Sequence, residues 1–528
     1  MRKWVIFWSV IGAAATLWAD VKLPAIFSDG MVIQRETKAP IWGTADPGEK
    51  ILVEASWGAN VSGTADSEGA WQVALSTPEA GGPFEIVVSG KNKVVISDVL
   101  AGEVWICTGQ SNMECNMGFF TKKARDPKNQ PAADYIRNEI KTANDPLLRH
   151  IKVPRKASPY VQVNDFEGQW VSVHPETTSK ITATGYFFAR ELRKKLNVPV
   201  GLVECAWGGT RVEPWISEST YRAHAELKAY YEQEMATLEK QTAAYSAADA
   251  QQQLERSLAK WEAKGKKGRK PRLKADPATG SQWPATLHKG MLSTIVPYAI
   301  KGAIWYQGES NRSYMTEEYE NRFSTLITSW RKEWGQGDFS FYWAQLAAFS
   351  NANSEPLEDN GWASICDQQR RCLVLPNTGM AVLNDIGEAQ DIHPRNKVDV
   401  GKRLAWWALA KDYGFELPYS GPLYQGVSVK GGKMMVTFDH VGSGLMVGHK
   451  KVLNDTVPSG EPLKRFQIAG ADRVWKWAEA EIVSVDTVSV SHPDVKNPTV
   501  VRYAWSANPE GANLYNKDGL PASLFTTE

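Results

Sequence analysis

Hydrophobic and polar residues alternate with a short period at both ends of the chain. Between residues 20 and 100, β-branched runs such as KILVEAS, WQVAL and FEIVVSG are separated by the turn sequences SDG, DPGE, SEG and SGKN. Strands at this spacing are typical of a small β-sandwich. From residue 418 to 528 the pattern returns, and VSVKGGKMMVTF predicts a hairpin around its two glycines. The C-terminal segment is therefore predicted to be a second β domain.

The pattern between residues 101 and 417 is different. Apolar runs of strand length are separated by stretches of helical periodicity, and these runs are VWICTG, PVGLVECAWGG, AIKGAIWYQGES, FSFYWAQLAAF and GMAVLNDIG. Residues 316–334 and 396–413 each carry apolar side chains on one side of a predicted helix. This alternation predicts an α/β fold, with a mostly parallel sheet and helices on both faces in a three-layer α/β/α arrangement. The two β domains would flank it.

One stretch interrupts this central domain. Between residues 224 and 284 the chain is rich in Ala, Glu, Gln and Lys, and then becomes basic in KWEAKGKKGRKPRLKADPATG. A solvated helical excursion with a flexible basic loop is one interpretation, and a docking patch for acidic glycans is the other. The sequence leaves both open.

Length and charge restrict the kinds of partner. A chain of 528 residues is too long for one hydrophobic core. Because 60 Lys and Arg are balanced by 59 Asp and Glu, no net charge attracts nucleic acid or an anionic membrane. Residues 1–19 have a basic start, an apolar run and an Ala-rich end, which predicts a signal peptide cleaved after Ala19, with a membrane anchor as the alternative. No later apolar run reaches the length of a membrane span, so we expect a secreted or periplasmic protein.

Cysteine and histidine spacing predicts neither a metal site nor a cofactor. The five cysteines form no CxxC pair, and the eight histidines form no HExxH pattern. An odd number of cysteines in an exported protein means at least one thiol outside any disulfide. Cys366 and Cys372 are the pair best placed for a disulfide.

Polar clusters follow four of the predicted strands. In chain order they are GQSNM with Ser111, WGGTR with Gly208 and Gly209, WYQGESN with Gln307, Glu309 and Asn311, and QDIHPRNK with Asp391 and His393. In open α/β sheets, ligands lie beyond the carboxyl ends of the strands. The four clusters are therefore predicted to meet at one edge of the sheet.

Together these clusters suit acyl transfer. Ser111 would be the nucleophile and His393 the base that takes its proton. The oxyanion would be stabilised by the backbone N–H groups of Ser111 and Gly209 and by a side-chain amide from Gln307 or Asn311. Each cluster alone has a simpler interpretation, since a serine at a helix start is commonly an N-cap.

Four blocks carry a resemblance to a known family: GQSNM at 109–113, WGGT at 207–210, WYQGESN at 305–311 and DIHPRNK at 391–397. With them the chain resembles the SGNH-hydrolase superfamily and, within it, the sialate O-acetylesterase family of carbohydrate acetylesterases. FSDGMVIQR near the start and YAWSANPEGANLYNKDGLPASLF near the end are also similar to that family. The resemblance implies an SGNH-type central domain, the site roles given above, and an acetyl ester on a sugar as the substrate.

The chain departs from the superfamily pattern beside the histidine. Many members have an Asp three residues before the catalytic His, but here that residue is Gln390, and Asp391 is two before. Either Asp391 reaches the imidazole through a different turn and completes a triad, or Ser111 and His393 act as a dyad oriented by a backbone carbonyl or by Gln390.

Other residues near these motifs are candidates for substrate contact. Trp207 and Trp215 could stack on a sugar ring, and Arg211 could bind the carboxylate of a sialic acid. Glu309 could act as a general acid or substrate contact, or as a buried carboxylate that orders its loop.

The favoured hypothesis is a secreted serine carbohydrate O-acetylesterase whose partner is an acetylated sugar or glycan, with sialic acid O-acetyl esters as the first substrate class. Acetylxylan or another acetylated polysaccharide is the alternative substrate. A non-catalytic glycan-binding protein is the alternative of another class, and a lipase or thioesterase is a third. The sequence leaves open which sugar and which hydroxyl position are involved.

Overall fold

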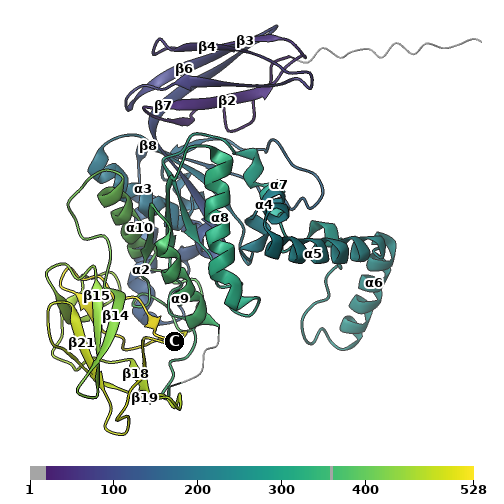
Figure 1. Ribbon diagram of the computed structural model, residues 1–528. Helices are drawn as coiled ribbons and strands as arrows, with labels where there is room; N and C mark the ends of the chain where they lie inside the picture. The colour runs from purple at the N-terminus through teal and green to yellow at the C-terminus, as the bar shows by residue number, and fades with distance from the viewer. Residues whose placement is uncertain (1–19, 357–360) are drawn as a thin grey trace, which may run out of the picture.

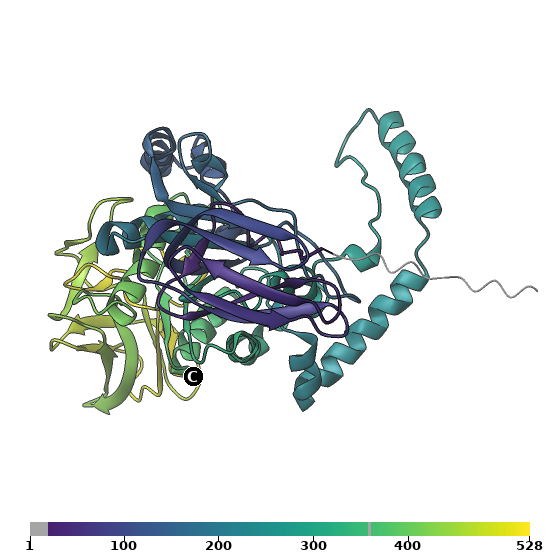
Figure 2. The ribbon, with the colours of Figure 1, turned by 90° about the horizontal axis from the view of Figure 1, so that it is seen from above.

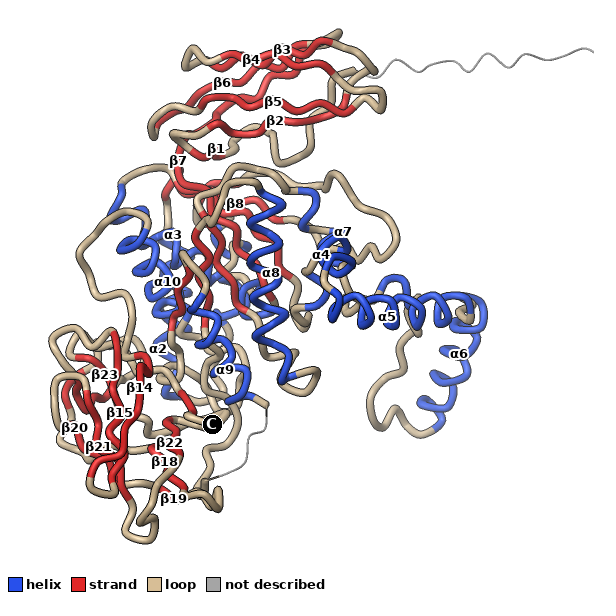
Figure 3. The backbone as a smooth tube through the Cα atoms, viewed as in Figure 1, coloured by secondary structure: helices blue, strands red, loops and turns tan. Residues whose placement is uncertain are grey.

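The computed structural model describes residues 20–356 and 361–528, so the predicted signal peptide lies outside the described residues. A central α/β body lies between an N-terminal β region, at the top of Figure 1, and a C-terminal β region, at its lower left. Figure 3 shows the strands of the central sheet enclosed by helices, while both flanking regions consist of strands and loops. This architecture confirms the predicted fold class.

The central sheet has seven strands in one continuous order. In that order they are β13 (Thr378–Ala381), β12 (Ser340–Ala344), β11 (Gly302–Tyr306), β7 (Lys93–Gly109), β10 (Val200–Ala206), β8 (Asp145–Lys152) and β9 (Val171–Val173). All neighbours are parallel except β8 and β9. The five predicted apolar runs supply five of these strands. The motifs GQSNM, WGGT and WYQGESN directly follow β7, β10 and β11.

Strand β8 was not predicted because its sequence, DPLLRHIK, places polar residues where a buried strand is apolar. Arg149 and His150 are both buried, and each has an acidic partner. Arg149 donates to the Asp98 side chain at 2.9 Å, and Nε2 of His150 lies 2.8 Å from the Glu204 carboxylate. Partners from distant segments thus make these polar side chains compatible with the interior.

Helices cover both faces of the sheet, as predicted. Helices α3 (Ala183–Leu196) and α10 (Lys397–Lys411) pack together on one face, where a Cβ on Gly401 would lie 2.5 Å from the backbone nitrogen of Phe188. Helix α8 (Tyr319–Trp334) covers the other face. The remaining helices are α1 (Ser111–Glu114), α2 (Gln130–Thr142), α4 (Glu218–Ala223), α5 (Ala225–Ala243), α6 (Ala247–Ala263), α7 (Thr286–Gly290) and α9 (Trp362–Arg371).

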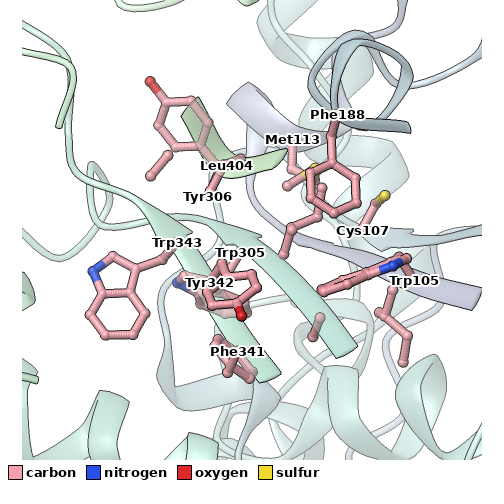
Figure 4. Packing of buried hydrophobic residues seen from close by; sticks show 14 of the residues in the cluster. Trp105, Cys107, Met113, Phe188, Trp305, Tyr306, Phe341, Tyr342, Trp343 and Leu404 are labelled. Carbon is pink, nitrogen blue, oxygen red and sulfur yellow. The ribbon is translucent and has the colours of Figure 1, made fainter. Parts of the chain in front are cut away.

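Aromatic side chains alternate between the two faces of the sheet and fill both layers (Figure 4). Tyr342 on β12 packs near Trp407 of α10, with ring centroids 6.3 Å apart. Its neighbour Trp343 points to the opposite face and meets Phe323 of α8 at 5.2 Å. Because successive residues of a strand face opposite sides, the FYW sequence of β12 contributes side chains to the hydrophobic layers on both faces of the sheet.

Strand β7 links the N-terminal region to the central sheet. Its first half pairs with β6 (Gly81–Ser89) and its second half with β10 and β11. The expected boundary between residues 100 and 101 falls inside this 17-residue strand. The other N-terminal strands are β1 (Val32–Gln34), β2 (Lys38–Thr44), β3 (Lys50–Ala55), β4 (Asn60–Thr64) and β5 (Ala70–Ser76).

The C-terminal region forms three small antiparallel sheets. The strands of the first are β14 (Leu423–Lys430), β15 (Lys433–Asp439), β21 (Thr487–Ser491) and β20 (Glu479–Ile482); of the second, β19 (Lys476–Trp477), β18 (Phe466–Ala469), β22 (Val500–Tyr503) and β24 (Phe525–Thr526); and of the third, β17 (Val457–Pro458), β16 (Leu445–His449) and β23 (Leu514–Asn516). The predicted hairpin is β14 and β15. This region contacts the central body through Gln345, whose side chain donates to Ser523 at 2.9 Å.

The interruption at residues 224–284 forms a projecting pair of helices. Helices α5 and α6 extend away from the body in both views, and an exposed loop, residues 264–274, follows α6 (Figures 1 and 2). The chain then returns to the body near Gln282. No helix in the described ranges has the length and apolarity needed to cross a membrane.

The expected disulfide between Cys366 and Cys372 does not form, and all five cysteines are thiols. Cys366 lies in α9 and Cys372 follows the end of that helix. Six residues of helix correspond to a rise of about 9 Å. That rise exceeds the Cα separation of about 7 Å that a disulfide can span.

Candidate active site

The carboxyl ends of β7 and β11 approach each other at a turn that requires glycine. Gly109 ends β7 with a φ of +127°, and a Cβ there would lie 2.3 Å from the carbonyl oxygen of Tyr306 at the end of β11. The backbone N–H of Gln110 donates to the same carbonyl at 2.9 Å. The chain then enters α1, so the glycine of GQSNM fixes where the following serine lies.

Ser111 and His393 are brought together at this edge of the sheet. Ser111 is the first residue of α1, and Gln110 is its N-cap, so the interpretation of Ser111 as an N-cap is wrong. The Oγ of Ser111 lies 2.8 Å from Nε2 of His393, although the residues are 282 positions apart. The imidazole is 22% exposed. This separation is suitable for proton transfer from a hydroxyl to a neutral imidazole.

Asp391 lies beside the other nitrogen of the imidazole. Its Oδ1 is 3.6 Å from Nδ1 of His393 and accepts the backbone N–H of His393 at 3.1 Å. Its Oδ2 accepts from Arg395 at 3.2 Å. Burial alone would raise the pKa of Asp391, but His393 and Arg395 outweigh it and lower the pKa to about 2. The carboxylate is therefore ionised, but it is farther from Nδ1 than a hydrogen bond requires.

Gln390, the residue at the usual position of the acid, is exposed. Its backbone carbonyl accepts from Arg125 at 2.6 Å. The structure thus places a carboxylate, and not the Gln390 carbonyl, against the imidazole.

The loop after β10 is held against α1 by a hydrogen bond to Glu114, which also pairs with Arg155. Glu114 accepts the backbone N–H of Gly208 at 2.7 Å and two N–H groups of Arg155 at 2.5 Å each. A Cβ on Gly208 would lie 3.1 Å from the Cβ of Ser111. Gly209 follows with a φ of +79° and is exposed. Among the described residues, the backbone N–H groups of Ser111 and Gly209 have no acceptor, so both are available to a ligand.

The two side-chain amides expected at the oxyanion are engaged elsewhere, which corrects that expectation. Nε2 of Gln307 donates to the Thr210 carbonyl at 3.1 Å and to Oδ1 of Asn311 at 2.7 Å. Nδ2 of Asn311 donates to both oxygens of the Glu213 carboxylate at 3.1 Å. Both amides are fully buried. Their N–H groups already have acceptors, and because Thr210 and Glu213 belong to the loop after β10, the two amides stabilise that loop.

Glu309 is a buried carboxylate, which corrects its assignment as a substrate contact and fits the alternative of a buried carboxylate that orders its loop. One oxygen accepts from Nδ2 of Asn112 at 2.6 Å, and the other is buried with no hydrogen-bond partner among the described residues. Burial raises the pKa of Glu309, an effect opposed by Asn112. Asn112 in turn accepts from Nζ of Lys397 at 2.8 Å.

The three residues proposed for sugar contact lie in different environments. Trp215 is fully buried, so the prediction that it stacks on a sugar ring is wrong. Trp207 is half-buried, with the guanidinium of Arg155 5.7 Å from the centre of its ring. The guanidinium of Arg211 lies 3.5 Å from the ring centre of Tyr314, and its Nε donates to Gln282 at 3.0 Å. Trp207 and Arg211 therefore remain candidates.

Several site residues were missed in the sequence. Phe119 is 40% exposed and stands edge-on to the imidazole of His393, with centroids 5.6 Å apart. Asn112 and Lys397 lie within the quoted motifs but were given no role. Asn112 directly follows Ser111 and Lys397 lies four residues after His393, and this closeness in sequence could have indicated a role in the site. In the described parts of the chain, no group of three or more His, Cys, Asp or Glu side chains is arranged to hold a metal ion.

Comparison with known proteins identifies a family. The family model for "Carbohydrate esterase, sialic acid-specific acetylesterase" matches residues 101–248 and 280–410. The sialate O-acetylesterases of Homo sapiens and Pongo abelii are each 27% identical over 96% of this chain and 94% of their own length. A carbohydrate acetylesterase from Xanthomonas citri has 34% sequence identity and a TM-score of 0.76, covering 96% of this chain and 99% of that one.

Fold and matched residues together define an esterase of the hydrolase class. The chain belongs to the family of carbohydrate esterases described as sialic acid-specific acetylesterases. Residues 249–279 lie outside the matched ranges. They comprise most of α6 and the basic loop.

Proposed function

We propose that the protein is an exported serine carbohydrate O-acetylesterase. The observation that carries this proposal is the 2.8 Å contact between Oγ of Ser111 and Nε2 of His393 at the carboxyl ends of the strands. Beside it, the backbone N–H groups of Ser111 and Gly209 are available to stabilise an oxyanion. The side-chain amides first considered for that role are already bonded in the interior.

The mechanism follows from these positions. His393 takes the proton of the Ser111 hydroxyl while Oγ attacks the acetyl carbonyl, and the N–H groups of Ser111 and Gly209 stabilise the oxyanion. The intermediate collapses as the C–O bond to the sugar breaks, and His393 returns the proton to the departing sugar oxygen. Water, deprotonated by His393, then attacks the acetyl-enzyme; acetate leaves as its bond to Oγ of Ser111 breaks, and His393 returns the proton to that oxygen. The ionised Asp391 stabilises the imidazolium that forms in both steps.

Acetate release from 4-nitrophenyl acetate by the wild type and by Ser111→Ala tests this mechanism. We expect kcat to fall by at least about 10³-fold in the variant, because a nucleophile of this kind cannot be replaced by a neighbouring group. Equal rates would show that the serine mechanism is wrong. A panel of acyl chain lengths separates an acetylesterase from a lipase or thioesterase, which would prefer long chains.

We further propose acetylated sialic acid as the first substrate class, on the basis of the family and the relatives' names. Acetylxylan is the alternative, and rates on 9-O-acetylated sialic acid and acetylated xylan compare the two. Arg211 is the candidate for binding the carboxylate of sialic acid, although two of its nitrogens already donate to Gln282. If Arg211→Ala weakens cleavage of the sialoside and of a neutral acetylated sugar equally, Arg211 does not read the carboxylate.

Export rests on the sequence of residues 1–19. Cleavage after Ala19 would make Asp20 the first residue of the mature protein. Sequencing the N-terminus of protein recovered from outside the cytoplasm tests this expectation, and recovery of the intact Met1 terminus would contradict it.

A further inference from the structure

Lys397 is a buried cation that the proposed mechanism does not use. It is the first residue of α10 and has no exposed surface. An unpaired ammonium in the interior is costly, so its contacts should explain its presence. Nζ donates to Oδ1 of Asn112 at 2.8 Å and to the backbone carbonyl of Pro394 at 2.8 Å.

These two contacts join the segments on either side of the proposed reaction. Asn112 directly follows Ser111, and Pro394 directly follows His393. Asn112 also donates through Nδ2 to the backbone carbonyl of Ile392 at 3.0 Å. The carbonyls on both sides of His393 are thus held by two side chains that are hydrogen-bonded to each other.

Glu309 supplies the counter-charge for this arrangement. Its carboxylate accepts from the same Nδ2 of Asn112 at 2.6 Å. The ammonium and the carboxylate therefore act on the two ends of one amide, which polarises both hydrogen bonds and fixes the orientation of Asn112. Phe120 and Tyr306 enclose Nζ, with ring centres 4.7 and 5.5 Å away.

We infer that Lys397, acting with Asn112, is a positioning residue that sets the distance between Ser111 and His393. The His393 loop makes its turn outside any helix or strand, so regular backbone hydrogen bonds do not determine its distance from α1. The hydrogen bonds to the carbonyls of Ile392 and Pro394 determine this distance instead, because these two residues are the sequence neighbours of His393. This inference rests on the proposed serine mechanism.

Lys397→Met tests the inference, since methionine fills similar space without a donor or charge. We expect kcat on 4-nitrophenyl acetate to fall by about 10²-fold, with KM within about twofold, because a small misplacement of the pair has a cost of this order. The rate of Ser111 labelling by a fluorophosphonate should fall in parallel, since that reaction needs the pair but no sugar. Thermal unfolding confirms that the variant is folded.

Lys402→Met is the matched control, because it makes the same chemical change on the same helix. Lys402 contacts Trp406 of its own helix, at 4.8 Å from the ring centre, and is not part of the site. Its kcat should equal that of the wild type. An equal loss in this control would overturn the inference, as would an unchanged kcat in a folded Lys397→Met protein.

A double variant separates positioning from independent effects. If Lys397 and Asn112 act as one clamp, Lys397→Met combined with Asn112→Leu should have a kcat within about threefold of the slower single variant. Multiplied losses of kcat would overturn the shared role.

If Lys397→Met does not fold, Lys397→Gln replaces it, because the glutamine amide can still donate to one of the two acceptors. An intermediate kcat would then support the inference, and a wild-type kcat would overturn it.

Ser111→Ala is measured in the same assay to separate the two proposals. Wild-type activity in Ser111→Ala would refute the serine mechanism itself. An inactive Ser111→Ala beside a fully active Lys397→Met would refute only the positioning role.

Discussion

The role of Asp391 can be tested through the charge it places beside the imidazole. In the proposed mechanism His393 takes the serine proton, and the resulting imidazolium lies 3.6 Å from an ionised carboxylate oxygen. At that distance the attraction is about 4.6 kcal/mol for an effective dielectric constant of about 20, and about 1.2 kcal/mol in water. Arg395 shares the carboxylate and both side chains are partly exposed, so we take a value of about 2 to 3 kcal/mol between these limits.

Asp391→Asn removes this attraction and keeps an oxygen that can accept the backbone N–H of His393. A loss of 2 to 3 kcal/mol corresponds to a fall in kcat of about 30- to 150-fold. A hydrogen-bonded triad that controls the imidazole tautomer would lose about 10⁴-fold. The assay is kcat on 4-nitrophenyl acetate at a pH near 7.5, with the melting temperature as a measure of folding.

Gln390→Ala is the matched control for this prediction. Gln390 lies three residues before His393 and is exposed. We expect its kcat to match the wild type. A loss below about tenfold in Asp391→Asn would refute the electrostatic argument and favour the dyad. A loss near 10⁴-fold would show that the carboxylate closes the 3.6 Å gap during turnover.

Three further predictions concern other parts of the molecule. Gly208→Ala should lower kcat by about 10²-fold, because the added Cβ would lie 3.1 Å from the Cβ of Ser111. Gly209→Ala adds a Cβ with no atom within 4 Å, so it should lower the unfolding free energy by about 1 kcal/mol and lower kcat less than Gly208→Ala does. Equal losses of kcat in the two variants would contradict this prediction. Burial lowers the pKa of Lys397 to about 8, below its value of about 10.4 in the unfolded chain, so the unfolded state binds more protons between these values. The unfolding free energy of the wild type relative to Lys397→Met should then rise by about 3 kcal/mol from pH 8 to 10.4, as measured by urea titration, and a flat difference would contradict the assignment. Replacing the seven basic residues of 264–274 by Ser or Gln should leave kcat unchanged if the loop is a solvated excursion, and a salt-sensitive loss of binding to an acidic polysaccharide would instead support a docking patch.

The sequence predicted those features that depend on local pattern. Apolar periodicity identified helix 316–334, which appears as α8 with the expected buried face, and it located the five parallel strands that precede or support the site. Ordered motifs at strand ends predicted that Ser111 and His393 would meet, because parallel strands bring their carboxyl ends to one edge.

The sequence could not predict features that depend on distant partners. Strand β8 was missed because Asp98 and Glu204, which stabilise its polar residues, come from strands β7 and β10, far away in the sequence. Gln307 and Asn311 have the right amide chemistry for an oxyanion, but their acceptors at Thr210 and Glu213 can be recognised only in three dimensions. A sequence gives the type of a polar side chain, whereas its free hydrogen-bonding groups depend on the whole fold.

The shared strand β7 has a mechanical consequence for the enzyme. Its residues 93–101 are paired with β6 and its residues 103–109 with β10, so one strand connects the N-terminal β region to the turn that precedes Ser111. Any swing of that region about the central body would have to break strand pairing within the sheet. The N-terminal region is therefore expected to move together with the site, and a chain shortened to begin at Ala101 would lose the first half of this strand along with its partners β1 and β6.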